Sequence, residues 1–230
     1  MTTLLNVPRY HLVQRFNYVE LPWAILAFVF LIDVVILALT PAGHDPNRYV
    51  GGLGSIFVFV FILGLQSVAR SLPFGLALGA SRRSYYLGTG LLAVSLAAVY
   101  GLAIVVLQAV ERATGGWGMN MGFFRVPYIL QGSWYLTWLT SFVVFTLLFA
   151  YGMWFGLVYR RWSLPGLVGF LAGQVTVLVA GALAATWTHA WHDIGHFFTS
   201  LSAAGLTGLL AALAAVLLAG GYATMRRVAV

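Results

Sequence analysis

The sequence predicts an all-α integral membrane protein with six transmembrane helices, an N-terminal interfacial elbow helix and a short cytoplasmic coupling helix. All of these elements belong to one transmembrane domain, residues 1–230. Two observations predict this fold class. Hydrophobic residues make up 61 % of the chain and charged residues only 7 %, whereas about a quarter of a soluble domain is charged. The apolar residues also gather in runs of about 18 or more, the length at which a helix crosses roughly 30 Å of hydrocarbon.

The predicted spans follow one another with short polar segments between them, and no linker marks a second domain. They lie near residues 21–40, 51–69, 85–110, 134–158, 164–187 and 201–223. Before the first span, residues 4–19 place apolar and polar side chains on opposite sides of a helical projection. This pattern predicts an elbow helix lying on the membrane surface. A disordered basic tail is the alternative interpretation of this segment.

Arginine supplies all 12 cationic residues and divides unequally between the two sets of loops. The smaller set holds Arg48, Arg112 and Arg125. The larger set, on the side of both termini, consists of Arg9, Arg15, Arg70, Arg82, Arg83, Arg160, Arg161, Arg226 and Arg227. Cytoplasmic loops carry the excess of positive charge, so both termini are expected in the cytoplasm. The net charge of +7 then reflects topology, and no nucleic-acid partner is predicted. Tyr85 and Tyr86 are expected at the headgroup depth that aromatic residues favour.

The cytoplasmic turn between the second and third spans is too apolar for a solvated loop. Its sequence, RSLPFGLALGASRRSYYLG, occupies residues 70–88. Ser71 is placed to cap a short helix, Pro73 suits its first turn, and Gly79 can end it. An exposed apolar helix of this kind predicts a protein partner, or else a helix resting on the headgroups.

The order of these parts, with the reading FGLALGASRRSYYLGT at residues 74–89, resembles the permease subunits of bacterial ABC transporters of the ABC-2 type. The resemblance covers nearly the whole chain and is most specific over residues 72–89. It implies that two subunits, identical or homologous, pair in the bacterial plasma membrane. It also implies a separate cytoplasmic ABC ATPase subunit, which would bind ATP and magnesium. The surface coupling to that subunit would be formed by Pro73, Phe74, Leu76, Leu78, Arg82 and Arg83. Phe74, Leu76 and Leu78 would seat in a groove of the ATPase.

The chain itself offers neither a motor nor an obvious catalytic group. It contains no lysine, which a Walker-type loop needs to reach nucleotide phosphates. It contains no cysteine, which excludes disulfides, thiolate metal sites and cysteine nucleophiles. We therefore expect no enzyme activity and no cofactor in this chain alone. The scarcity of polar residues in the spans favours export of a lipophilic substrate.

Asp33 is the one formally charged residue within a predicted span. An ionised carboxylate at the bilayer centre costs about 2.5–3.5 kcal/mol on insertion scales, so Asp33 is expected to face the bundle. Gln66 or Gln174 on other spans are the proposed partners. A role in the transport pathway and a structural hydrogen bond between helices are the two hypotheses. Two small-residue pairs, Gly152 with Gly156 and Gly169 with Gly173, predict close helix packing.

The outer segment THAWHDIGHFFTS, residues 188–200, holds the last candidate site. One continuous helix would set four possible zinc ligands on a single face. These residues are His189, His192, Asp193 and His196. A membrane metalloenzyme is therefore an alternative function, although an amphipathic interfacial helix explains the same pattern. By the resemblance, this segment would be re-entrant. A non-transporting signalling or scaffold subunit is a third alternative for the whole chain.

Overall fold

The computed structural model describes residues 16–40, 48–127, 130 and 132–225. Its helices, in chain order, are η1 (Phe16–Glu20), α2 (Leu21–Leu39), α3 (Gly54–Ala69), α4 (Ser71–Ala77), α5 (Arg82–Ala113), η2 (Gly116–Asn120), α6 (Trp134–Trp187), α7 (Trp191–Ser200) and α8 (Ala203–Met225). The fold is all-α except for two short strands, β1 (Arg48–Tyr49) and β2 (Met121–Gly122), which pair in parallel. The elbow helix predicted over residues 4–19 lies outside the described residues, apart from η1, which runs directly into α2.

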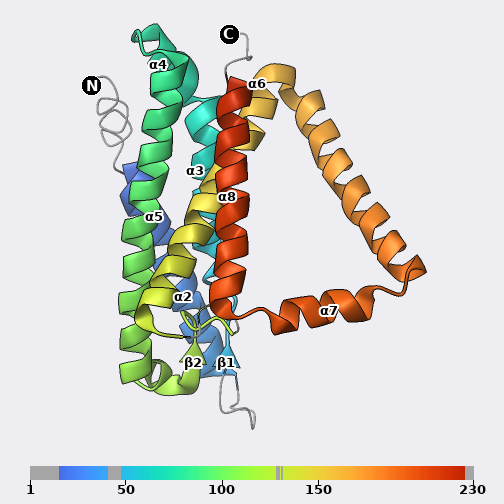
Figure 1. Cartoon of the computed structure of the whole chain (residues 1–230). Coiled ribbons are helices and arrows are strands. Elements are labelled where there is room, and N and C mark those ends of the chain that lie inside the picture. Colours follow the sequence, from blue (N-terminus) through green and yellow to red (C-terminus); the bar gives the residue numbers. More distant parts are fainter. Residues whose placement is uncertain (1–15, 41–47, 128–129, 131, 226–230) are drawn as a thin grey trace.

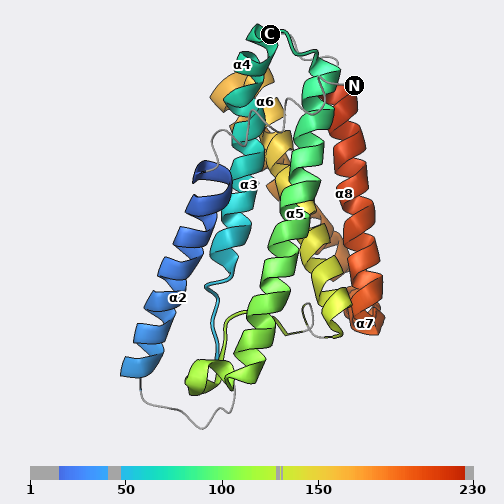
Figure 2. The same ribbon diagram turned by 90° about the vertical axis from the view of Figure 1, so that its left-hand side faces the viewer.

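The long helices run alongside one another in an elongated bundle (Figures 1 and 2). At one end lie α4, the start of α5 and a sharp bend in α6, and at the other lie β1, β2, η2 and α7. By length and composition, the described part of the chain holds five helices that can cross a membrane, with α6 counted once. The predicted class of helical membrane protein is therefore supported, and each of the other four long helices begins and ends within a few residues of its predicted span.

Helix α6 is two helices joined by a reversal of the chain at Ser163. Ser163 has φ 54° and ψ −153°, a conformation that interrupts the helix, and Pro165 follows in the first turn of the second limb. Ser163 lies in the gap between the predicted spans 134–158 and 164–187, and the first limb continues through Arg160 and Arg161 before it ends. Each limb exceeds the roughly 20 residues that cross a bilayer. The second limb leaves the bundle (Figure 1), and most of its side chains are exposed.

Glycines allow the first limb of α6 to cross α3 at backbone contact. A Cβ added to Gly64 would lie 2.1 Å from the Phe149 carbonyl oxygen, and one added to Gly152 would lie 2.0 Å from the Phe61 carbonyl oxygen. Packing through Gly152 and its neighbour Gly156 is therefore confirmed. The second predicted pair is different. A Cβ at Gly169 or Gly173 would have open space around it, so among the described residues this pair makes no close helix contact of the predicted kind.

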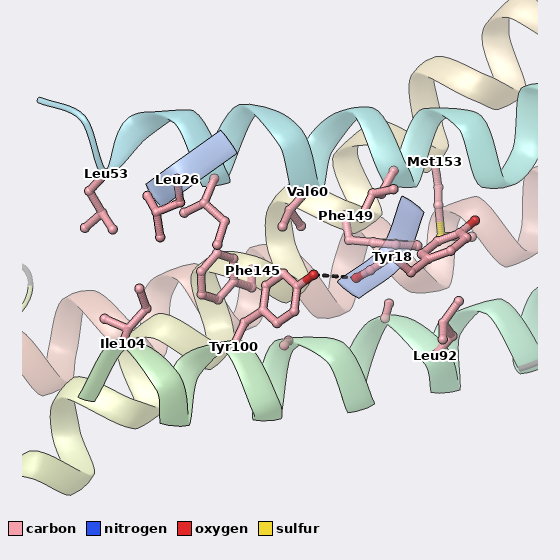
Figure 3. Packing of buried hydrophobic residues seen from close by; sticks show 14 of the residues in the cluster. Tyr18, Leu26, Leu53, Val60, Leu92, Tyr100, Ile104, Phe145, Phe149 and Met153 are labelled. Carbon is pink, nitrogen blue, oxygen red and sulfur yellow. Dashed lines mark hydrogen bonds between the residues drawn. The ribbon is translucent and has the colours of Figure 1, made fainter. Parts of the chain in front are cut away.

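Buried aromatic residues from α5 and α6 fill the centre of the bundle (Figure 3). The Tyr100 hydroxyl donates a hydrogen bond to the Tyr18 carbonyl and so ties η1 to α5. Tyr85 and Tyr86 lie near the start of α5, and both rings are buried in the bundle. Their position at headgroup depth stays a prediction. Their hydroxyls donate to carbonyls of Ser67 and Leu218, respectively, which satisfies the polar end of each ring inside the bundle.

Candidate functional site

Helix α4 continues the direction of α3 with a single residue between them. The Arg70 backbone is helical, with φ −105° and ψ −46°, and it occupies the N-cap position of α4. The prediction that Ser71 caps this helix is therefore wrong, since Ser71 is already its first residue and no side chain caps it. The predicted end is confirmed. Gly79 adopts φ +84°, and the Ala80 N–H donates to the Gly75 carbonyl at 3.1 Å, which closes the last turn.

One side of α4 packs on the bundle, and the other carries exposed apolar side chains. Leu72 is 1 % exposed, and Gly75 lies against the ring of Tyr85, where an added Cβ would be 2.6 Å from a ring carbon. Phe74 and Leu78 are 52 % and 66 % exposed. The expectation of three outward apolar side chains needs correction, because Leu76 is half-buried and packs against the core. Pro73 is also half-buried.

The described arginines separate between the two ends of the bundle. Arg70 joins α3 to α4, Arg82 and Arg83 begin α5, and Arg160 and Arg161 precede the bend of α6, so all five lie at the end that carries α4. We call this the basic end. The other three described arginines belong to the opposite end, which we call the strand end: Arg48, Arg112 and Arg125. The structure thus groups the arginines as the sequence predicts.

A buried carboxylate, Glu111, organises the strand end. Its Oε2 accepts hydrogen bonds from the backbone N–H groups of Phe123 and Phe124, both at 2.9 Å, and from Trp117 Nε1 at 3.2 Å. Its Oε1 pairs with Arg125 Nε at 2.9 Å. The Glu111 side chain is fully buried, so these donors replace its water shell. Sequence reasoning missed this network.

Asp33 does not have the partners that the sequence suggested. Its Oδ2 is buried without a hydrogen-bond partner among the described residues, and it lies so close to Gly52 that a Cβ there would be 2.3 Å away. Gln174 instead accepts a hydrogen bond from the Tyr151 hydroxyl at 2.7 Å. Gln66 lines a cavity at the basic end with Arg70. Both proposed pairings with Asp33 are therefore wrong, because the two glutamines lie in other parts of the bundle.

The outer histidines do not share one helical face. The preceding helix ends at Trp187, and His189 has φ +55° in the turn before α7, so only His192, Asp193 and His196 are helical. No group of three or more histidine, aspartate or glutamate side chains is placed to hold a metal ion within the described ranges. Helix α7 is exposed along its whole length and crosses from the second limb of α6 to the base of α8 (Figure 1).

Comparison with protein-family models, curated proteins and solved structures finds no match to this chain. The chain's own residues therefore carry the functional proposal.

Proposed function

We propose that this chain is the transmembrane subunit of an ATP-driven transporter, similar to ABC-2 permeases, that exports a lipophilic substrate. A separate cytoplasmic ATPase subunit binds ATP and magnesium and drives it. The protein lies in the bacterial plasma membrane with both termini in the cytoplasm. If the two limbs of α6 are counted separately, the chain crosses the membrane six times.

The observation that carries the proposal is the surface of α4. This short helix is fixed to the bundle by Leu72 and Gly75, yet it presents Phe74 and Leu78 outward at the basic end. The excess of arginine assigns that end to the cytoplasm. An exposed apolar side chain at a cytoplasmic surface suits a groove of a partner protein. Because α4 is fixed to the bundle, it can transmit a movement of that partner to α3 and α5.

A second permease subunit accounts for the exposed second limb of α6. Gly169 and Gly173 on this limb have open space beside them, and small residues allow close approach of a neighbouring helix in a membrane. The scarcity of polar side chains in the spans supports a lipophilic substrate. The described outer histidines give the metalloenzyme alternative no geometric support.

The proposal is tested by the substitution Phe74→Asp, with Phe74→Leu as its matched control. Phe74 is half-exposed, so the variant is expected to fold and insert, but a carboxylate cannot be desolvated in an apolar groove. Binding of the copurified ATPase should weaken at least about tenfold in Phe74→Asp and stay within about twofold in Phe74→Leu. Affinity is measured with both purified subunits in detergent.

Substrate-stimulated ATP hydrolysis in the reconstituted complex separates a transporter from a signalling or scaffold subunit. Loss of that stimulation in Phe74→Asp is the expected result. If the same amount of ATPase copurifies with Phe74→Asp as with the unchanged protein, α4 is not the docking element and the transporter proposal loses its main support.

A further inference from the structure

A polar cavity of about 470 Å³ lies at the basic end, between η1, the last turn of α3 and the start of α4. It is lined by Asn17, Tyr18, Leu63, Gln66, Arg70, Ser71 and Phe74. Its polar character is unusual for this protein. The cavity between α2 and α5, by contrast, is lined by apolar and aromatic side chains such as Leu26, Phe30 and Leu107.

Four polar side chains line the cavity with unused hydrogen-bonding capacity: Asn17, Gln66, Arg70 and Ser71. Within the described part of the chain, none of these four side chains makes a hydrogen bond or an ion pair. All four can donate hydrogen bonds, and Arg70 adds the positive charge of a guanidinium. Among the residues that the structure describes, no carboxylate lines the cavity. This set of groups selects an anion with several acceptor oxygens.

The walls of the cavity are held in place by contacts made behind them. On one side, the buried Tyr100 hydroxyl holds the carbonyl of Tyr18, next to Asn17 (Figure 3). On the other side, the buried Leu72 and the contact of Gly75 with the Tyr85 ring fix α4. A site whose walls are already fixed loses little entropy when it binds a ligand.

We propose that this cavity binds the phosphate group of an anionic phospholipid in the cytoplasmic leaflet. Arg70 supplies the charge, and the amides of Asn17 and Gln66 and the hydroxyl of Ser71 donate to phosphate oxygens. Leu63, deeper in α3 than Gln66 and Arg70, provides apolar surface for the first acyl carbons. Basic pockets at the cytoplasmic ends of membrane helices are suited to such headgroups. The proposal requires membrane insertion but not transport, so it stands apart from the proposed function.

The full chain, purified in an uncharged detergent, is titrated with short-chain phosphatidylglycerol while its thermal unfolding is followed. Saturable stabilisation is expected, and Arg70→Gln should raise the apparent Kd roughly tenfold or more. Arg83→Gln is the matched control, since it removes the same charge at the same end but outside the cavity. Its apparent Kd should stay within about twofold of the unchanged protein.

Gln66→Leu provides a second variant, because it removes the amide without changing the charge. A several-fold rise in the apparent Kd is expected, and an unchanged Kd in this variant overturns the site. Equal weakening by Arg83→Gln and Arg70→Gln also overturns it, because surface charge would then explain binding. So does equal stabilisation by phosphatidylcholine of the same chain length.

Inorganic phosphate is titrated in parallel to identify the source of the phosphate group. Weak or absent stabilisation by inorganic phosphate, with phosphatidylglycerol active, supports a lipid headgroup. If inorganic phosphate stabilises the protein equally and competes with the lipid, the lipid assignment is overturned and the cavity is a site for free phosphate.

Discussion

Glu111 and Asp33 are two carboxylates with opposite surroundings. Glu111 accepts three N–H groups and pairs with Arg125, so all of its buried oxygens are satisfied. Asp33 has a buried oxygen without a described partner. A buried charge stabilises a fold only when hydrogen bonds replace its hydration. We therefore regard Glu111 as a structural residue of the strand end, whereas Asp33 contributes no helix-to-helix hydrogen bond that the structure describes.

Glu111→Gln should lower the free energy of unfolding by about 2–3 kcal/mol, because the amide loses the charge opposite Arg125 and turns a donor toward backbone N–H groups. Unfolding in a denaturing detergent measures this change. Asp193→Asn on the exposed helix α7 is the control and should stay within about 0.5 kcal/mol. A comparable effect in both variants would contradict a specific role for the Glu111 network.

At the scale of the elements, helix packing depends on a few residues whose size decides the approach. Gly152 and Gly156 bring the first limb of α6 against α3, whereas Gly169 and Gly173 on the second limb have open space beside them among the described residues. Both pairs have the same spacing in the sequence. Only the arrangement of the helices shows that the first pair, and not the second, brings two described helices together.

Gly152→Ala should destabilise the protein by about 1–3 kcal/mol, since the new Cβ would lie 2.0 Å from a backbone oxygen of α3 and the helices must move apart. Gly169→Ala is its control, with a change within about 0.5 kcal/mol. The same unfolding measurement compares them. An effect of Gly169→Ala as large as that of Gly152→Ala, seen in the isolated subunit, would contradict the packing described here.

For the whole molecule, the division of the arginines between two ends predicts which end faces the cytoplasm. Because the chain has no cysteine, single cysteines report orientation without background. Ala77→Cys in α4 and Ser200→Cys in α7 place an exposed thiol at the basic end and at the strand end. In intact cells, a membrane-impermeant thiol reagent should label only Ser200→Cys, and permeabilised cells should show labelling of both. Labelling of Ala77→Cys in intact cells would reverse the orientation and remove the proposed docking of an ATPase.

The sequence alone determined the features that depend on local properties, namely the length of the apolar runs, the positions of the arginines and the turn residues. It predicted the helical class, the positions of α2, α3, α5 and α8, the existence of α4 and its end at Gly79. The tertiary structure alone decided which side chains face one another. In the structure, Leu76 packs against the core, Glu111 lies at the centre of a hydrogen-bond network, and His189 lies in a turn outside helix α7. These outcomes depend on contacts between distant parts of the chain, and periodicity along one segment carries no information about what packs beside it.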